Sequence, residues 1–234
     1  MKINNIASMA MLKIFLFLLL FIIKPIILFA DDSIDIDSLE FLLNSAKEDT
    51  NKVILLNDIS WQLKDVNYLE SKQYAEQALK LAEQINYSKG KSDAYLSIGN
   101  YYQHIHDNKK AFMNYQEVLK IAESTNDLFL KVRVYNKFYL MYNQIGDIET
   151  AVGYAFKVLE ISEKNDYQAA IAATYINLGV LYLRQGSNDK AKEYLDKSLI
   201  IAKKLGHKKN IALSYSNLGV LAQRDGNYNV ALNY

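Results

Sequence analysis

Apolar side chains recur along most of the chain at the spacing of amphipathic helices. Tyr95, Ile98, Gly99 and Tyr102 lie at i, i+3, i+4 and i+7, and the same pattern starts again at Tyr175. This spacing places the side chains on one face of a helix. A second apolar stripe follows each first one after a short polar break. The pattern therefore predicts units of two amphipathic helices, each of about 18 residues.

Four segments of the chain superpose without a gap at a period of forty residues. They begin at Tyr95, Tyr135, Tyr175 and Tyr215, as YLSIGNYYQHIHDNKKAFMN and YINLGVLYLRQGSNDKAKEY illustrate. A fixed period of this length is typical of stacked repeats, so we predict an all-α solenoid of antiparallel helix pairs. We expect these tyrosines to lie in equivalent places in the core between helices. The predicted units are residues 51–90 (a degenerate first repeat), 91–130, 131–170, 171–210 and 211–234 (a truncated repeat).

Residues that favour turns stand where the apolar period breaks. His106, Gly146, Gly186 and Gly226 precede Asp107, Asp147, Ser187 and Asn227, and the other junction carries Asn86, Asn126, Asp166 and Gly206. Glycine, asparagine and aspartate tolerate a positive φ after a helix, and Asp, Ser and Asn can cap the next helix. These positions predict the tight turns.

Two further features concern packing within the array. Residues 31–50 form an acidic segment and a short helix, for which Asp37 and Glu40 make a capping box and whose leucines could cover the first pair. Tyr139 stands where the other units have a glycine, and Ala222 stands where they have tyrosine. We therefore expect irregular packing in the second full unit.

The first thirty residues predict a signal peptide. Lys2 and Lys13 precede an apolar run from Ile14 to Ile23, and Ala30 offers a cleavage site. Ten residues reach about 15 Å, half of the roughly 30 Å needed to cross a bilayer, so cleavage is favoured over an uncleaved signal anchor. We expect a periplasmic or otherwise extracytoplasmic protein, attached to the membrane only if this segment is retained or if a later one follows.

Composition removes several classes of function. The chain has 27 basic against 26 acidic residues and no cysteine, which argues against nucleic-acid binding, disulfides and thiolate metal sites. No phosphate loop, nucleophile elbow or zinc-protease motif occurs, and His104 and His106 lack the i, i+4 spacing of a zinc pair. We expect no enzyme activity, no cofactor and no metal.

The first helices of successive units line the concave side of such an array, and their exposed stripe is the candidate binding surface. Neighbouring helices about 10 Å apart match about three extended residues, so a side-chain amide on each unit could pair with a peptide backbone. The asparagines could instead bond to a neighbouring helix, and the arginines could simply oppose the helix dipole. The candidate residues are Asn100, His104, Lys137, Gln144, Asn177, Arg184, Asn217 and Arg224.

The order Tyr95, Ile98, Gly99, Tyr102, Ala111 and Tyr115 resembles the tetratricopeptide consensus, although the usual unit has 34 residues. The longer unit is similar to that of kinesin light chains and bacterial peptide-responsive regulators. The resemblance implies a right-handed solenoid that binds a protein or peptide, and in the long-repeat relatives an asparagine at the place of Asn177 and Asn217 contacts the peptide backbone.

The signal peptide and long repeats together also resemble the extracytoplasmic sensor regions of bacterial histidine kinases and related membrane-anchored regulators. Tyr234 lies only eight residues into the last predicted helix, so we expect the chain to continue. This favours the input region of a longer signalling protein. The alternative is a free periplasmic adaptor or scaffold without an output domain.

Overall fold

The computed structural model describes residues 35–234, and the predicted signal peptide lies outside them. Every regular element of the described residues is a helix, which confirms the all-α fold. None of the described helices combines the length and the apolar character needed to cross a membrane. The chain divides into a unit that ends at Asn44 and a unit from Ser45 to Tyr234.

Helix α2 (Ile36–Ser45) accounts for the described part of the first unit. It starts one residue before Asp37, so Asp37 lies inside its first turn and the predicted cap at Asp37 is wrong. Asp35 supplies the first carbonyl, which accepts from the Leu39 amide at 3.1 Å. Covering of the first helix pair by this helix stays a prediction.

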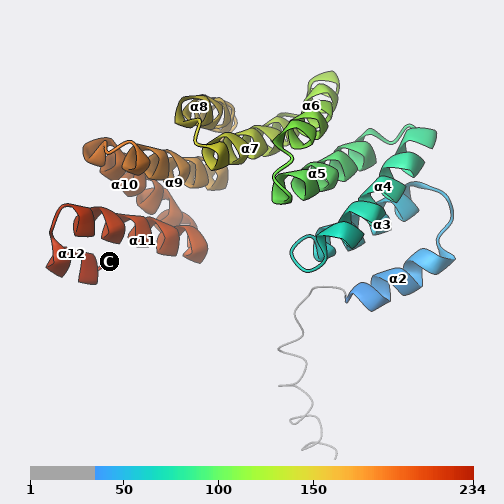
Figure 1. Ribbon diagram of the computed structural model, residues 1–234, viewed down its shortest axis with the longest axis horizontal. Coiled ribbons are helices and arrows are strands. Elements are labelled where there is room, and N and C mark those ends of the chain that lie inside the picture. Colours follow the sequence, from blue (N-terminus) through green and yellow to red (C-terminus); the bar gives the residue numbers. More distant parts are fainter. Residues whose placement is uncertain (1–34) are drawn as a thin grey trace, which may run out of the picture. The chain divides into compact units, whose positions relative to one another are not determined.

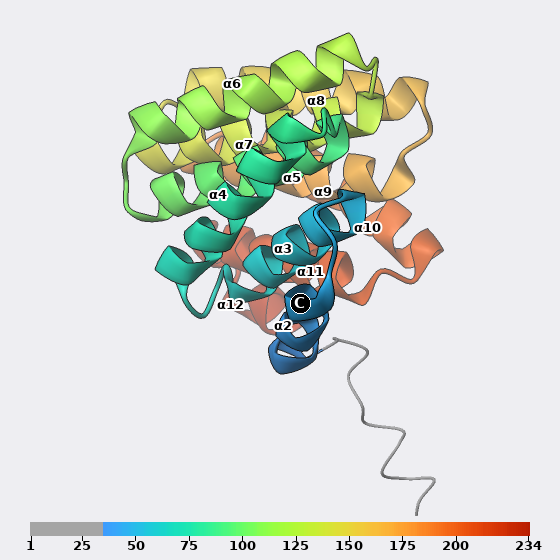
Figure 2. The same cartoon turned by 90° about the vertical axis from the view of Figure 1, so that its right-hand side faces the viewer.

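The second unit is an array of antiparallel helix pairs in which each helix packs on the next (Figure 1). Odd-numbered helices are the first members of their pairs. Figure 2 looks at the array from the side of α3 to α6, with the later pairs behind them. The prediction of stacked helix pairs is thus confirmed. The helices are α3 (Thr50–Leu63), α4 (Tyr68–Gln84), α5 (Ser88–His104), α6 (Asn108–Ser124), α7 (Leu128–Ile145), α8 (Ile148–Lys164), α9 (Gln168–Arg184), α10 (Asn188–Leu205), α11 (Lys208–Arg224) and α12 (Tyr228–Leu232).

The turns follow the predicted chemistry. A positive φ occurs at all eight predicted turn positions, four of which are glycines. Three of the other residues are Asn or Asp, which adopt this conformation more readily than other side chains do. The residues are Asn86, His106, Asn126, Gly146, Asp166, Gly186, Gly206 and Gly226.

Aspartates cap several of the helices that follow these turns. The carboxylates of Asp107 and Asp147 each accept a backbone N–H three residues on at 3.1 Å, and Asp127 does so at 2.9 Å. Ser187 and Asn227 make no such side-chain bond. The capping prediction is therefore confirmed at the two aspartates and wrong at Ser187 and Asn227.

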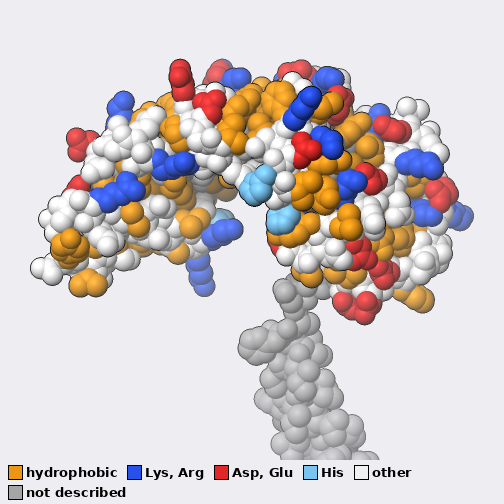
Figure 3. Space-filling model, in the orientation of Figure 1, with side chains coloured by type: hydrophobic (Ala, Val, Ile, Leu, Met, Phe, Trp, Pro, Cys, Tyr) orange, Lys and Arg blue, Asp and Glu red, His pale blue; other side chains and the backbone are white. Residues whose placement is uncertain are grey.

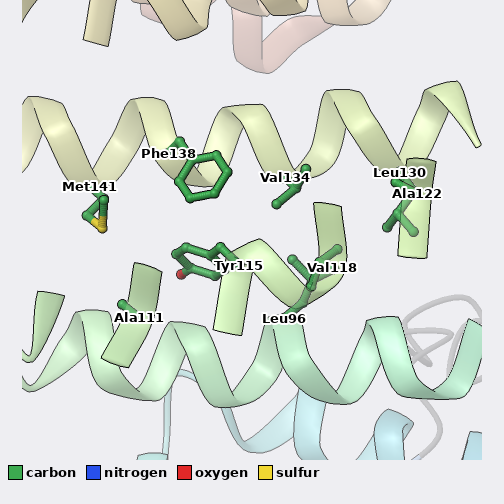
Figure 4. Close-up of a cluster of buried hydrophobic side chains, with 9 residues drawn as sticks. All are labelled: Leu96, Ala111, Tyr115, Val118, Ala122, Leu130, Val134, Phe138 and Met141. Atoms are coloured by element: carbon green, nitrogen blue, oxygen red, sulfur yellow. The ribbon is translucent and has the colours of Figure 1, made fainter. Parts of the chain in front are cut away.

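The core lies between the two members of each pair and the first helix of the next. Figure 4 shows the cluster shared by α5, α6 and α7, in which the buried Tyr115 ring meets Phe138 edge-on at a centroid distance of 6.0 Å. Close approach at this point requires the small residue Gly99, because a Cβ there would lie 2.4 Å from the Tyr115 ring. Gly179 faces the buried Leu195 in the same way, at 2.7 Å.

The second full unit exchanges the sizes of the two partners. Tyr139 occupies the position of Gly99 and Gly179, and Ala155 occupies that of Tyr115 and Leu195. Both are buried in one cluster, so the large side chain now comes from α7 and the small one from α8. Around this unit the packing differs as we expected: α3 packs on α5 and α9 on α11, whereas α7 is held mainly by α6 and α8.

The tyrosine series has like surroundings: Tyr95, Tyr135 and Tyr175 are half-buried and pack against the core clusters, which agrees with their predicted place between helices at the edge of the core. The Tyr95 hydroxyl lies 3.5 Å from a Glu83 carboxylate oxygen, and the Tyr175 hydroxyl lies 3.2 Å from that of Glu163. A phenol needs a polar partner for its hydroxyl, and this keeps the ring at the edge of the core.

Candidate functional site

The inner face of the array is formed by the odd-numbered helices, and we define three rows on it by repeat position. The first row is Ser97, Lys137, Asn177 and Asn217, the second is Asn100, Leu140, Val180 and Val220, and the third is His104, Gln144, Arg184 and Arg224. The three rows follow one another along each helix, with the third at its carboxyl end. Figure 3 shows the hollowed side of the array, where histidine and basic side chains gather.

The first row differs from unit to unit. The Asn217 amide donates to the Leu213 carbonyl of its own helix at 2.8 Å. Asn177 is half-buried, and its amide forms no hydrogen bond with the described residues. The predicted asparagine ladder therefore has one free amide at Asn177 and one partly used amide at Asn217, and a role for these groups in ligand binding stays a prediction.

The second row contains an amide that lies beside a buried hydroxyl group of the core. The Tyr115 hydroxyl lies 3.0 Å from Asn100 Oδ1 and 2.8 Å from Gln103 Oε1. Burial raises the pKa of Tyr115, so it remains a neutral donor. A hydroxyl has one proton to donate, so Tyr115 donates to only one of these two oxygens, and the shorter distance favours Gln103.

The third row links successive units. Arg224 Nη1 donates to the Leu183 carbonyl at 2.6 Å, and Arg184 Nη1 donates to the Asn143 carbonyl at 2.9 Å. These carbonyls lie at the carboxyl end of the preceding odd-numbered helix. The arginines therefore oppose the dipole of the neighbouring helix as well as that of their own.

The same position is polar in the earlier units. Gln144 Nε2 lies 3.0 Å from His106 Nδ1, and its Oε1 accepts from Gln103 at 3.4 Å. The His104 ring stacks on Tyr68 with centroids 3.3 Å apart. The side chains of the third row thus mainly form contacts between successive units. No pattern in the sequence predicted these contacts.

A pocket of about 420 Å³ opens on the inner face among α3, α4, α5 and α7. It brings together four of the predicted residues, whereas the predicted residues of α9 and α11 lie outside it. It also contains aromatic residues that we did not predict, because Trp61 and Tyr68 belong to the degenerate first repeat. Its lining includes Trp61, Tyr68, Asn100, Tyr101, His104, Lys137 and Gln144.

Lys137 has an unusual electrostatic environment in this pocket. Its half-buried position, followed by the charges of Arg133 and Lys64, lowers the pKa of its ammonium group to about 8, and Asp65 opposes this shift. Lys64 is paired with Asp65 at 2.6 Å, and Arg133 is paired with Asp93 at 3.1 Å. Among residues 35–234 no acidic side chain lies within ion-pair distance of Lys137.

Other chemistry is limited on the described surface. His, Asp and Glu side chains of residues 35–234 form no group of three that could hold a metal ion. The pocket combines aromatic rings, amides and one unpaired ammonium group. Such groups can bind a ligand by stacking, hydrogen bonds and charge.

Stacked helix pairs with a concave inner face define a helical-repeat scaffold for binding proteins. The sequence supports this class, because the tetratricopeptide repeat family model matches residues 132–204 and 170–234. Residues 132–234 of the chain are therefore tetratricopeptide repeats. No functionally curated protein is significantly similar to it.

Several solved structures share the fold. BtubC (BKLC) from P. vanneervenii is 20% identical, with a TM-score of 0.67 over 85% of this chain and 83% of that chain. A Rap protein complexed with competence and sporulation factor is 20% identical, with a TM-score of 0.75 over 85% of this chain and 56% of that one.

A third similar structure is a signal transduction ATPase with numerous domains, with a tetratricopeptide repeat sensor, from Pyrococcus horikoshii. It is 21% identical, with a TM-score of 0.63 over 84% of this chain and 32% of that chain. At these identities the likeness establishes the fold.

Proposed function

We propose that this chain binds an extended segment of a partner protein along its inner face. The observation that carries the proposal is the free amide of Asn177 on the same face as the open pocket around Lys137. An amide offers both a donor and an acceptor, which is what the backbone of an extended peptide requires. The similar Rap structure, which holds a bound factor, supports binding by this fold.

The proposed role is non-enzymatic recognition. The polar groups of the inner face are amides, paired charges and the ammonium group of Lys137, and the third row is engaged in bonds between units. These groups favour binding of a segment over covalent chemistry on it.

We further propose that recognition takes place outside the cytoplasm and forms the input of a longer signalling protein. The apolar run from Ile14 to Ile23 supports export, and the repeat sensor of the similar signal transduction ATPase supports the input role. A fusion of alkaline phosphatase after Tyr234 tests the location, because that enzyme is active only when exported. An inactive but stable fusion contradicts export.

The reading frame after Tyr234 tests the signalling role. A membrane-spanning run followed by a catalytic or DNA-binding region supports an input region. A stop codon after a capping helix supports the free adaptor instead.

Binding along the inner face is tested by replacing Asn177 and Asn217 together with alanine. We expect capture of partners from an envelope extract to weaken while the helical content stays nearly unchanged. The matched control replaces Asn114 and Asn165, which lie on even-numbered helices or their ends, and keeps full capture. Equal capture by both variants contradicts binding through the first row.

A further inference from the structure

A tyrosine recurs at one place in the second helix of the repeats, and one unit lacks it. In units 131–170 and 171–210 this ring stacks on a tyrosine of the first helix. Tyr154 stacks on Tyr142 with centroids 5.6 Å apart and an interplanar angle of 13°, and Tyr194 stacks on Tyr182 at 5.4 Å and 4°. At the period of forty residues the place holds Tyr74, Asn114, Tyr154, Tyr194 and Tyr234.

In the unit 91–130 the corresponding ring of the first helix is Tyr102, and α6 carries Asn114 in place of the tyrosine. The Asn114 amide donates to the Lys110 carbonyl of its own helix at 2.8 Å, so this side chain folds back along α6. Tyr101 meets Tyr102 edge-on at 5.3 Å, which does not replace a stacked ring. The hairpin of α5 and α6 thus leaves the place of the stacked ring unfilled.

A pocket of about 690 Å³ opens at this place. It lies between α4 and α6, which both pack on α5. In its lining Ile98 is buried, Leu79 is half-buried, and Met113 has 55% of its surface accessible. Methionine adapts its shape to neighbouring groups and makes favourable contacts with aromatic rings. With Tyr102, these side chains form a surface that suits a planar ring.

The charged groups at this pocket are mostly paired with one another. Glu76 is paired with Lys72 at 2.7 Å, and Asp107 is paired with Lys110 at 3.2 Å. Lys109 is exposed, and the surrounding solvent and salt screen its charge. The balance of charges favours a neutral ring over an ionised ligand.

We infer that this pocket binds a tyrosine side chain of a partner protein, whose ring stacks on Tyr102 as Tyr154 and Tyr194 stack on their partners in the later units. The hydroxyl group lies at the charged rim, where it keeps polar neighbours. Asn114 supplies no group to the ligand and acts by leaving the space open. The lining of this pocket shares no residue with the three rows of the inner face, so the inference goes beyond the proposed function.

The size of the pocket favours a protein side chain over a free aromatic molecule. An enclosed apolar cavity of about 150 Å³ already holds a benzene ring. The larger pocket can therefore take a ring together with the backbone that carries it. In the neighbouring units the equivalent ring is likewise carried by a helix, α8 or α10.

Methyl NMR of the full chain, isotope-labelled in its methionine methyl groups, follows binding directly. Met113 lines the pocket, and the buried Met141 is the internal control. The probes are acetyl-Ala-Tyr-Ala-amide, acetyl-Ala-Leu-Ala-amide and the free ring p-cresol. We expect the tyrosine peptide to shift the Met113 signal through its ring current and to bind about fivefold more tightly than the leucine peptide. It should also bind more tightly than p-cresol.

Four variants complete the experiment, each checked for its fold by circular dichroism. Asn114→Tyr should fill the pocket with the chain's own ring and abolish the preference for the tyrosine peptide, whereas Asn114→Ala keeps the space open and the preference. Tyr102→Leu retains an apolar side chain without a ring to stack on, so the preference should be lost. Tyr228→Leu, which removes an exposed ring outside the pocket, should keep it.

The inference is overturned if the leucine peptide binds as well as the tyrosine peptide, if the Met113 signal does not move, or if the preference survives in folded Asn114→Tyr or Tyr102→Leu. Equal or tighter binding of p-cresol assigns the pocket to a free aromatic molecule. A Met113 signal that moves with the concentration of the chain alone assigns it to a second copy. Either result also overturns the inference of a partner's tyrosine.

Discussion

Replacing Gly179 with alanine tests the closest approach between the two helices of a pair. The added Cβ would lie 2.7 Å from Leu195 Cγ and 2.8 Å from Leu195 Cδ2. Ordinary carbon contacts are about 3.5 to 4.0 Å, so Leu195 or its helix must move by about 1 Å. Because Leu195 is fully buried, we expect overpacking to cost about 1 to 3 kcal/mol.

Helix propensity acts in the opposite direction. Alanine stabilises a helix interior by about 1 kcal/mol relative to glycine. We therefore expect Gly179→Ala to lower the free energy of unfolding by about 1 kcal/mol in total. Gly153→Ala is the matched control, because Gly153 lies inside α8 with no neighbouring atom within 4 Å of the new Cβ, and it should raise the free energy of unfolding by about 1 kcal/mol.

Urea unfolding followed by circular dichroism measures both effects. For each variant, both the urea concentration at the midpoint and the slope of the unfolding free energy against urea concentration are compared with those of the natural chain. A changed slope would show that the repeat array no longer unfolds in one step. A stabilisation by Gly179→Ala as large as that by Gly153→Ala refutes the proposed close contact. Leu195→Ala should lower the free energy of unfolding less in a Gly179→Leu background than in the natural chain. The leucine introduced on α9 would then fill the space that the Leu195 side chain leaves.

Three further changes test the electrostatics and the caps. Burial lowers the pKa of Lys137 to about 8 from an ordinary 10.5, so the unfolded chain binds more protons between these values and stability rises with pH across this window. We expect Lys137→Met to stabilise the chain by on the order of 2 kcal/mol at pH 7 and by little above pH 10.5. Denaturation at several pH values measures this difference. A stabilisation that is the same at all pH values contradicts the titration of Lys137. Arg224→Met should lower the free energy of unfolding by about 1 kcal/mol through loss of the hydrogen bond to the Leu183 carbonyl, and Arg224→Lys should lower it by less. If Arg224→Met is as stable as the natural chain, this hydrogen bond contributes nothing to stability. Asp127→Ala should cost about 1 kcal/mol through loss of the cap on the Leu130 amide, and Asp127→Asn should cost much less; equal losses argue against capping.

The fold could be read from the sequence largely because its turns repeat in register. Asn126 and Gly146 tolerate a positive φ and stand forty residues from counterparts that do the same. Such local preferences do not depend on the rest of the molecule. The start of α2 was misplaced because Asp37 can act either as a cap or as a residue of the first turn.

The site was only partly predictable. Lys137 and Asn100 were found by their repeat positions, but their surroundings were not. Trp61 lies in the same pocket as Lys137 and Asn100 because the helices stack, although its unit departs from the repeat sequence. Arg184 donates a hydrogen bond to a carbonyl forty-one residues away in the sequence. These contacts depend on tertiary distances, which the helical period does not specify.

The exchange of large and small residues between α7 and α8 limits how this chain can change in evolution. A recombination that moved α7 without α8 would bring Tyr139 against Tyr115 or Leu195, where the natural partner is glycine. Crossovers in the loop between two pairs would keep each matched couple together. The hairpin, and not the single helix, is therefore the smallest piece of this gene that can be duplicated or shuffled without harm.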